Sequence, residues 1–84
     1  MSTRNATLAA LLIEALDAAA SDAAGKTAEL ASVAIEVLRA EGLGKVTASI
    51  TRKTRTLVFA EAECLADDGE RIALATSVHK IPAT

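Results

Sequence analysis

A chain of 84 residues is long enough for one small domain with a modest hydrophobic core, and we expect a single domain over residues 1–84. Hydrophobic residues make up 51% of it but aromatic residues only 1%, so its core must be built from Ala, Val, Leu and Ile. This composition lacks the stacking platforms of single-stranded nucleic-acid binders, and a net charge of −2 gives no general attraction to nucleic acid.

The N-terminal apolar run and the cysteine content are informative about the cellular location of the protein. The run from Leu8 to Ile13 is interrupted by Glu14, which makes it too short for a secretory signal or a membrane span. The single cysteine, Cys64, excludes an internal disulfide and any CxxC motif. We therefore expect a cytoplasmic protein without a membrane or nucleic-acid partner.

The first predicted element is a helix over residues 5–24, after a polar tail over residues 1–4. Its composition is dominated by Ala and Leu, which are strong helix formers. Asn5 is the predicted N-cap, since its side-chain oxygen can accept a backbone N–H of the first turn, and the helix proper then starts at Ala6. Gly25 provides the predicted C-terminal stop.

The polar residues of this helix are confined to one narrow stripe. At about 100° per residue, Thr7, Glu14, Asp17 and Ser21 fall close together on the helix surface. The remaining positions are almost all Ala, Leu or Ile. A helix with this pattern is predicted to be buried on most of its sides.

Residues 26–81 are predicted to form a sheet, because apolar and polar residues alternate there in several segments. An Asp68-Gly69 turn predicts a hairpin between the last two strands, with Gly69 free to adopt a positive φ. Pro82 ends the last strand. The predicted class is α+β, with strands at 27–39, 46–54, 56–65 and 71–80.

This layout resembles the hotdog fold, and in particular the small acyl-CoA thioesterases of the phenylacetyl-CoA thioesterase type. Glu14 sits at the family's acidic helix position, and Val46-Thr47-Ala48-Ser49-Ile50 is similar to the strand that follows the long one. Arg52-Lys53-Thr54-Arg55-Thr56 stands at the family's basic turn, with Thr54 in place of a glycine. Asn5-Ala6-Thr7 replaces the family's His-Gly-Gly, and the family's first strand has no counterpart.

The resemblance implies one buried helix wrapped by a four-stranded antiparallel sheet. We expect the order 46–54, 56–65, 71–80, 27–39, in which the first two pairings follow from hairpin lengths and the last from the resemblance. The resemblance also implies that strand 27–39 lies at a sheet edge and pairs with its copy, in a homodimer or a tetramer. The other edge, at 46–54, is left open by the missing first strand.

The resemblance further implies hydrolysis of an acyl-CoA thioester without a cofactor. In this role Glu14 is the general base or nucleophile and Asn5 a second catalytic residue, while the backbone amides of Ala6 and Thr7 polarise the thioester carbonyl. Arg52 and Arg55 are the expected contacts for the phosphates of coenzyme A.

Each of these residues also has a purely structural interpretation. Glu14 fits the solvated stripe of the helix, Asn5 needs no role beyond the N-cap, and basic residues in a turn are commonly just solvated. A non-catalytic hotdog homo-oligomer, which binds an acyl ligand or serves a structural role, is therefore the alternative function. One histidine, His79, predicts no metal site, and nothing in the sequence places a serine beside it.

Overall fold

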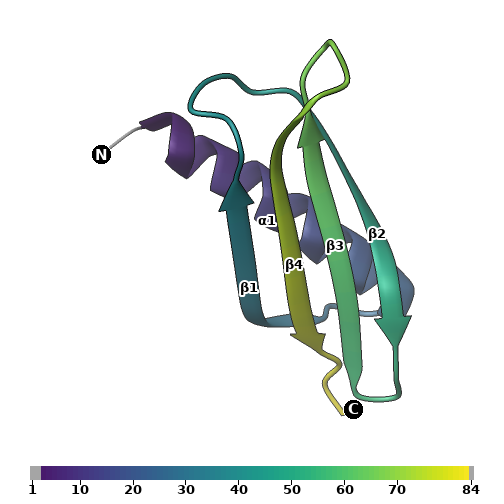
Figure 1. The fold of residues 1–84 in the computed structure, drawn as a ribbon. Coiled ribbons are helices and arrows are strands. Elements are labelled where there is room, and N and C mark those ends of the chain that lie inside the picture. Colours follow the sequence, from purple (N-terminus) through teal and green to yellow (C-terminus); the bar gives the residue numbers. More distant parts are fainter. Residues whose placement is uncertain (1–2, 84) are drawn as a thin grey trace.

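A computed structural model describes residues 3–83, in which one helix crosses one face of a four-stranded antiparallel sheet (Figure 1). The sheet order is β1-β4-β3-β2, which confirms the predicted α+β class and the predicted order of the strands. In chain order the elements are α1 (Thr3–Ala24), β1 (Glu29–Val37), β2 (Lys45–Lys53), β3 (Leu57–Leu65) and β4 (Arg71–Lys80).

The predicted turns are present. Gly25 ends α1 with a φ of 73°, and its N–H donates to the Ser21 carbonyl at 3.0 Å. Gly69 adopts a φ of 86° in the β3–β4 hairpin, where the Asp68 carboxylate accepts the Glu70 N–H at 3.0 Å. These are positions where glycine avoids the steric cost of a left-handed backbone.

One stripe of α1 faces the sheet and forms the core. Leu8, Leu12, Leu16 and Ala20 recur every four residues, so they lie above one another on the helix, and all four are fully buried. Most of their partners on the sheet are small, which allows the helix to lie close to the strands. The leucines pack with Ala60, Ala62, Cys64, Ile72, Ala73 and Ala75.

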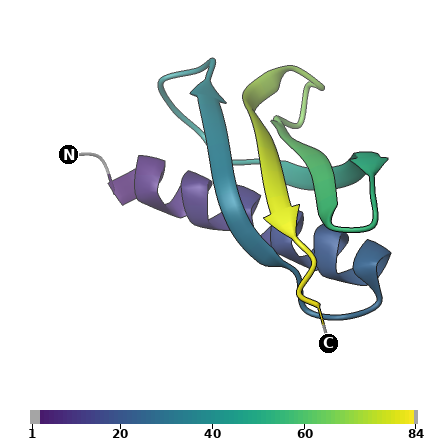
Figure 2. The ribbon, with the colours of Figure 1, turned by 90° about the horizontal axis from the view of Figure 1, so that it is seen from below.

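The prediction that α1 is buried on most of its sides is wrong for the single chain. Seen from below, the helix has the sheet on one side only (Figure 2). Ala10 and Ala18 are exposed, and Leu11 is 36% exposed. Four strands are enough to cover one stripe of a helix, and the apolar flanks remain open in the isolated subunit.

The start of α1 also differs from the prediction. Thr3 and Arg4 are helical and not part of a polar tail, so Asn5 lies inside the first turn and is not the N-cap. The Thr7 hydroxyl donates to the Thr3 carbonyl at 3.1 Å, as expected for a continuous helix. The other two residues of the predicted tail, at positions 1 and 2, lie outside the described residues.

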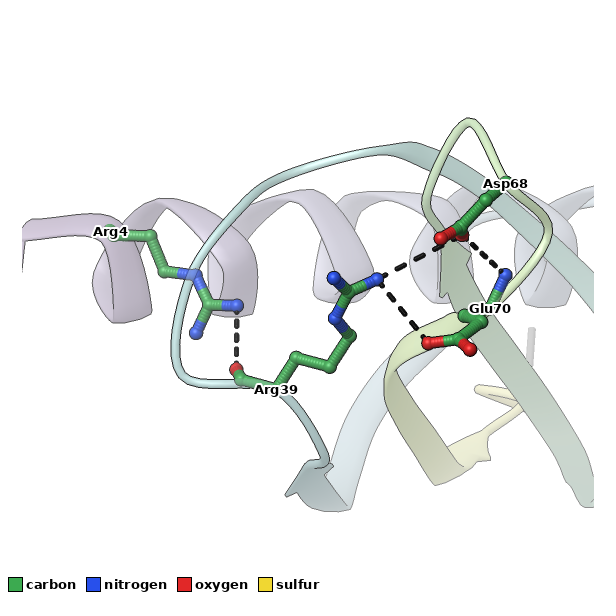
Figure 3. A network of polar contacts seen from close by, with 4 residues as sticks. All are labelled: Arg4, Arg39, Asp68 and Glu70. Carbon is green, nitrogen blue, oxygen red and sulfur yellow. Dashed lines mark hydrogen bonds and ion pairs between the residues drawn. The ribbon is translucent and has the colours of Figure 1, made fainter.

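A network of arginine contacts explains why the helix begins early (Figure 3). The guanidinium of Arg4 donates to the carbonyls of Gly42 and Arg39, each at 2.8 Å, and so ties the helix start to the β1–β2 loop. Arg39 lies 3.9 Å from Asp68 and 3.7 Å from Glu70 in the β3–β4 hairpin. Three segments far apart in sequence are thereby held at one end of the sheet.

We predict that Gly44→Ala destabilises the protein because the strand β2 begins in close contact with β3. A Cβ at position 44 would lie 1.9 Å from the Leu65 carbonyl oxygen, which no rotamer can relieve. The expected cost is about 2–3 kcal/mol, measured by urea unfolding. Gly25→Ala is the matched control, since it meets no atom within 4 Å and should cost only about 1 kcal/mol for its positive φ. Equal losses would show that the contact with Leu65 is relaxed easily.

Candidate functional site

Glu14, the predicted catalytic carboxylate, is exposed on the flank of α1. Within residues 3–83 its carboxylate takes part in no hydrogen bond or ion pair, unlike Asp17, its neighbour one turn further along the helix. Glu14 is thus accessible to a ligand. The polar stripe predicted for the helix divides into an open part with Thr7 and Glu14 and an engaged part with Asp17 and Ser21.

Asn5 is exposed near the helix start, where its side-chain oxygen accepts a hydrogen bond from Arg4 at 2.9 Å. Asn5 and Glu14 are nine residues apart, which places them about half a turn away from each other around the helix and about 14 Å apart along its axis. The two side chains therefore cannot act on the same bond within one chain.

The backbone amides predicted to polarise the thioester carbonyl belong to Ala6 and Thr7, the fourth and fifth residues of α1. Because α1 begins at Thr3, the N–H of Thr7 is directed to the Thr3 carbonyl by the helical hydrogen-bond pattern. Ala6 precedes Thr7 on the same turn and is exposed. The Thr7 N–H is therefore not a free donor for a ligand.

Arg52 and Arg55 lie at the far end of the molecule from the helix start. Arg52 is the second-last residue of β2, with its guanidinium 6.0 Å from the centroid of the Phe59 ring, and Arg55 is in the loop that follows. The helix start contacts Gly42, just before β2 begins, and a nine-residue strand is about 26 Å long. One chain therefore does not bring these arginines near Asn5.

The structure does bring together three polar residues that were not predicted to meet. Nε2 of His79 lies 2.7 Å from the Asp17 carboxylate, and Nδ1 lies 3.2 Å from the Ser77 hydroxyl. Since a carboxylate only accepts, Nε2 donates to Asp17, while Nδ1 shares the second hydrogen bond with the Ser77 hydroxyl. Both ring nitrogens of this buried histidine are thus satisfied.

This serine, histidine and aspartate arrangement has the composition of a hydrolytic triad but not its accessibility. His79 is fully buried and Ser77 is 5% exposed, so a substrate carbonyl cannot reach the hydroxyl. Asp17 is half-exposed at the rim. The network therefore joins α1 to β4 across the core. Its sequence signal was the two-residue spacing of Ser77 and His79, which puts both side chains on one face of a strand.

The sheet face opposite α1 carries a shallow cavity of about 420 Å³ that contains none of the predicted site residues. It is lined by hydroxyl groups and by Glu61 and Glu63, and the Glu63 carboxylate forms an ion pair with Arg71 at 3.1 Å. This cavity is separate from the helix and from the predicted chemistry.

Two further properties concern the described part of the chain. Among residues 3–83, no three His, Cys, Asp or Glu side chains are grouped so that they could hold a metal ion. The one helix in this range is not long and apolar enough to cross a membrane.

No protein-family model matches the chain, and no curated protein matches it in sequence. Solved structures do match it. A protein from the thioesterase superfamily has a TM-score of 0.81 at 20% identity, with 92% of this chain and 60% of that one covered. A Bacillus halodurans protein solved with CoA has a TM-score of 0.79 at 22% identity, with 89% and 56% covered.

A third match is zebrafish thioesterase superfamily member 2, with a TM-score of 0.65 at 19% identity and with 83% of this chain and 57% of that one covered. The chain thus spans about 60% or less of the length of these solved proteins. The match covers the helix and the strand order derived above. The fold of this chain is therefore the hotdog-like fold of thioesterase-superfamily structures.

Proposed function

We propose that the protein is a thioesterase-like hotdog protein that binds an acyl-CoA and hydrolyses its thioester with Glu14. The observation that carries this proposal is an accessible carboxylate without a polar partner among residues 3–83. It lies on the helix of a fold that one solved neighbour shares in a structure with CoA. A carboxylate that is drawn into an apolar environment when the ligand covers it becomes a stronger base. It can then activate water against the thioester carbonyl.

The proposed site needs two subunits. Asn5 and Glu14 lie half a turn apart on one helix, so a bond that contacts both must lie between the helices of different copies. The apolar flanks of α1 that stay open in the single chain, including Leu11, are the surfaces that such an assembly would cover. A homo-oligomer is therefore part of the proposal.

In this site Asn5 is the candidate hydrogen-bond donor to the carbonyl. Its oxygen is occupied by Arg4, which leaves the amide N–H groups of its side chain for a ligand. The proposal does not rely on the amides predicted at Ala6 and Thr7, because the Thr7 N–H belongs to the helical ladder. Neither a metal nor an organic cofactor is needed for this chemistry.

The second candidate function is a non-catalytic hotdog homo-oligomer that binds an acyl ligand. It is favoured by one observation, which is that the helix directs the Thr7 N–H to Thr3 and so removes a donor that the predicted chemistry used. The two candidates share ligand binding and differ in turnover. Release of free CoA from acyl-CoA substrates distinguishes them.

Replacing Arg52 and Arg55 together by alanine is expected to weaken CoA binding by about tenfold or more, because each guanidinium can form charge-assisted hydrogen bonds to phosphate. Isothermal titration calorimetry with CoA measures this change. The matched control replaces Lys26 and Lys80, which removes the same charge elsewhere and should leave the affinity within about twofold. If the arginine variant binds CoA as tightly as the control, these arginines do not contact the ligand.

A further inference from the structure

The carboxylate of Asp17 is held at one oxygen and open at the other. Its Oδ1 atom accepts the Nε2–H of His79 at 2.7 Å, and the side chain is 47% exposed. Within residues 3–83, no hydrogen bond or ion pair uses the second oxygen. Asp17 therefore presents one free acceptor at the surface of the molecule.

The histidine that holds Asp17 has little freedom to move. His79 is fully buried in β4, where its backbone pairs with Val58 of β3 on one side and with Leu30 of β1 on the other. Its Nδ1 atom lies 3.2 Å from the hydroxyl of Ser77, which is 5% exposed. A close-packed ring with a hydrogen bond at each nitrogen keeps one orientation. The position of the Asp17 carboxylate is thereby set by the sheet as well as by the helix.

Asp17 is also the nearest polar neighbour of Glu14 on α1. Residues three or four positions apart on a helix have Cβ atoms about 5–6 Å apart, so the neighbours of Glu14 stand at positions 10, 11, 17 and 18. Position 17 is the polar one, because the other three are Ala10, Leu11 and Ala18. Two carboxylates of the same helix therefore border one space, and the remaining side chains around Glu14 on this helix are apolar.

The two carboxylates differ in how far they can move. Glu14 is exposed and its carboxylate forms no hydrogen bond or ion pair within residues 3–83, so its longer side chain can turn toward a ligand. Asp17 is anchored by His79 and keeps its place. A mobile carboxylate is suited to removing a proton as a bond forms, whereas a fixed one is suited to holding a reactant in one orientation.

We propose that Asp17 is a further catalytic residue, which orients the water that Glu14 deprotonates, and that His79 is its positioning residue. This inference rests on the proposed thioesterase function. A water between the two carboxylates donates one O–H to Glu14 and the other to the free oxygen of Asp17. Its lone pairs then point away from both carboxylates, toward the thioester carbonyl of a bound substrate.

The reaction balances with these groups and water alone. A lone pair of the water oxygen forms the bond to the carbonyl carbon, the π electrons of the carbonyl move to its oxygen, and one proton passes to Glu14. When this intermediate collapses, the C–S bond breaks with its electron pair on sulfur, and the CoA thiolate takes the proton from Glu14. The second proton of the water leaves to solvent as the acid ionises. Asp17 accepts a hydrogen bond and keeps its charge throughout.

A purely structural role of Asp17 makes different demands on the side chain. To hold α1 against β4, position 17 needs only an acceptor for the His79 N–H, and asparagine provides one. Because Nε2 of His79 donates, the amide oxygen must face the ring, and the amide NH2 group takes the place of the free Asp17 oxygen. An NH2 group cannot accept a hydrogen bond from water. Asp17→Asn thus preserves the contact with His79 and reverses the polarity where the water is proposed to bind.

Steady-state kinetics of Asp17→Asn with an acyl-CoA that the natural protein hydrolyses test this proposal. We expect kcat to fall about 10- to 100-fold, because a misplaced nucleophile slows the chemical step, and KM to stay within about twofold. The unfolding midpoint should remain close to the natural value. Asp22→Asn, which neutralises an exposed carboxylate on the same helix, is the matched control and should keep the natural kcat.

Hydroxylamine gives a second readout that a structural role would not change. It is a stronger nucleophile than water and depends less on a base or on an orienting acceptor. In its presence the deficit of Asp17→Asn in CoA release, corrected for the reaction without enzyme, should shrink to about threefold or less. A variant whose site is merely distorted would be slowed by the same factor with both nucleophiles.

The outcomes separate this inference from the proposed function. Activity that is lost in Glu14→Gln but kept within about twofold in Asp17→Asn would overturn the role of Asp17 and leave Glu14 as the base. An equal deficit with water and with hydroxylamine would likewise overturn it, since Asp17 would then have a structural role only. No turnover of any acyl-CoA by the folded natural protein would overturn the proposed function, and this inference with it.

Discussion

Replacing His79 by alanine is expected to lower the free energy of unfolding by about 3–5 kcal/mol. The side chain is fully buried, so its removal leaves a cavity between α1 and β4. It also leaves the Ser77 hydroxyl, which is 5% exposed, without its hydrogen-bond partner. A domain of this size typically has about 5–10 kcal/mol of stability, so the variant should be close to unfolding at ambient temperature.

Urea unfolding followed by circular dichroism measures this loss, and Asp17→Asn is the control. Asparagine keeps an oxygen that accepts the His79 Nε2–H, and the Asp17 side chain is 47% exposed, so this change should cost less than about 1 kcal/mol. If the two variants are equally stable, the buried network is not what joins the helix to the sheet.

Replacing Glu14 by glutamine is expected to reduce acyl-CoA hydrolysis by at least about 100-fold, the usual contribution of a general base. Glutamine keeps the size and polarity of the side chain but removes its basicity. Because Glu14 is exposed and its carboxylate forms no hydrogen bond or ion pair within residues 3–83, the unfolding midpoint should not change. Asp22→Asn, which neutralises an exposed carboxylate near the end of the same helix, should keep full activity.

The turns and the positions of the strands could be predicted from the sequence, because they depend on residues that are close together in the chain. Gly25 and Gly69 adopt the positive φ values expected for a helix stop and a hairpin. The alternation of side chains located the strands to within two residues at each end. The order of the strands followed from hairpin lengths and from the family resemblance, and the structure has that order.

Contacts between distant segments account for what the sequence did not reveal. Asn5 looked like an N-cap because local rules do not include Arg4, whose bonds to the carbonyls of Arg39 and Gly42 support an earlier helix start. Likewise, the contact between Asp17 and His79 spans 62 residues, and only the packing of helix on sheet brings the two together. The periodicity of the sequence shows on which face of a helix or strand each residue lies, but it does not show which residue of another element it contacts.

Hydrolysis of acyl-CoA thioesters is the measurement that tests the proposed function most directly. Purified protein is incubated with short, long and aromatic acyl-CoA substrates, and free CoA is detected with a thiol reagent, in parallel with the Glu14→Gln variant. The proposal predicts release of CoA from at least one class of substrate by the natural protein and loss of that release in the variant. Release that continues unchanged in the variant, or no release from any substrate by a folded protein that binds CoA, would contradict catalysis by Glu14.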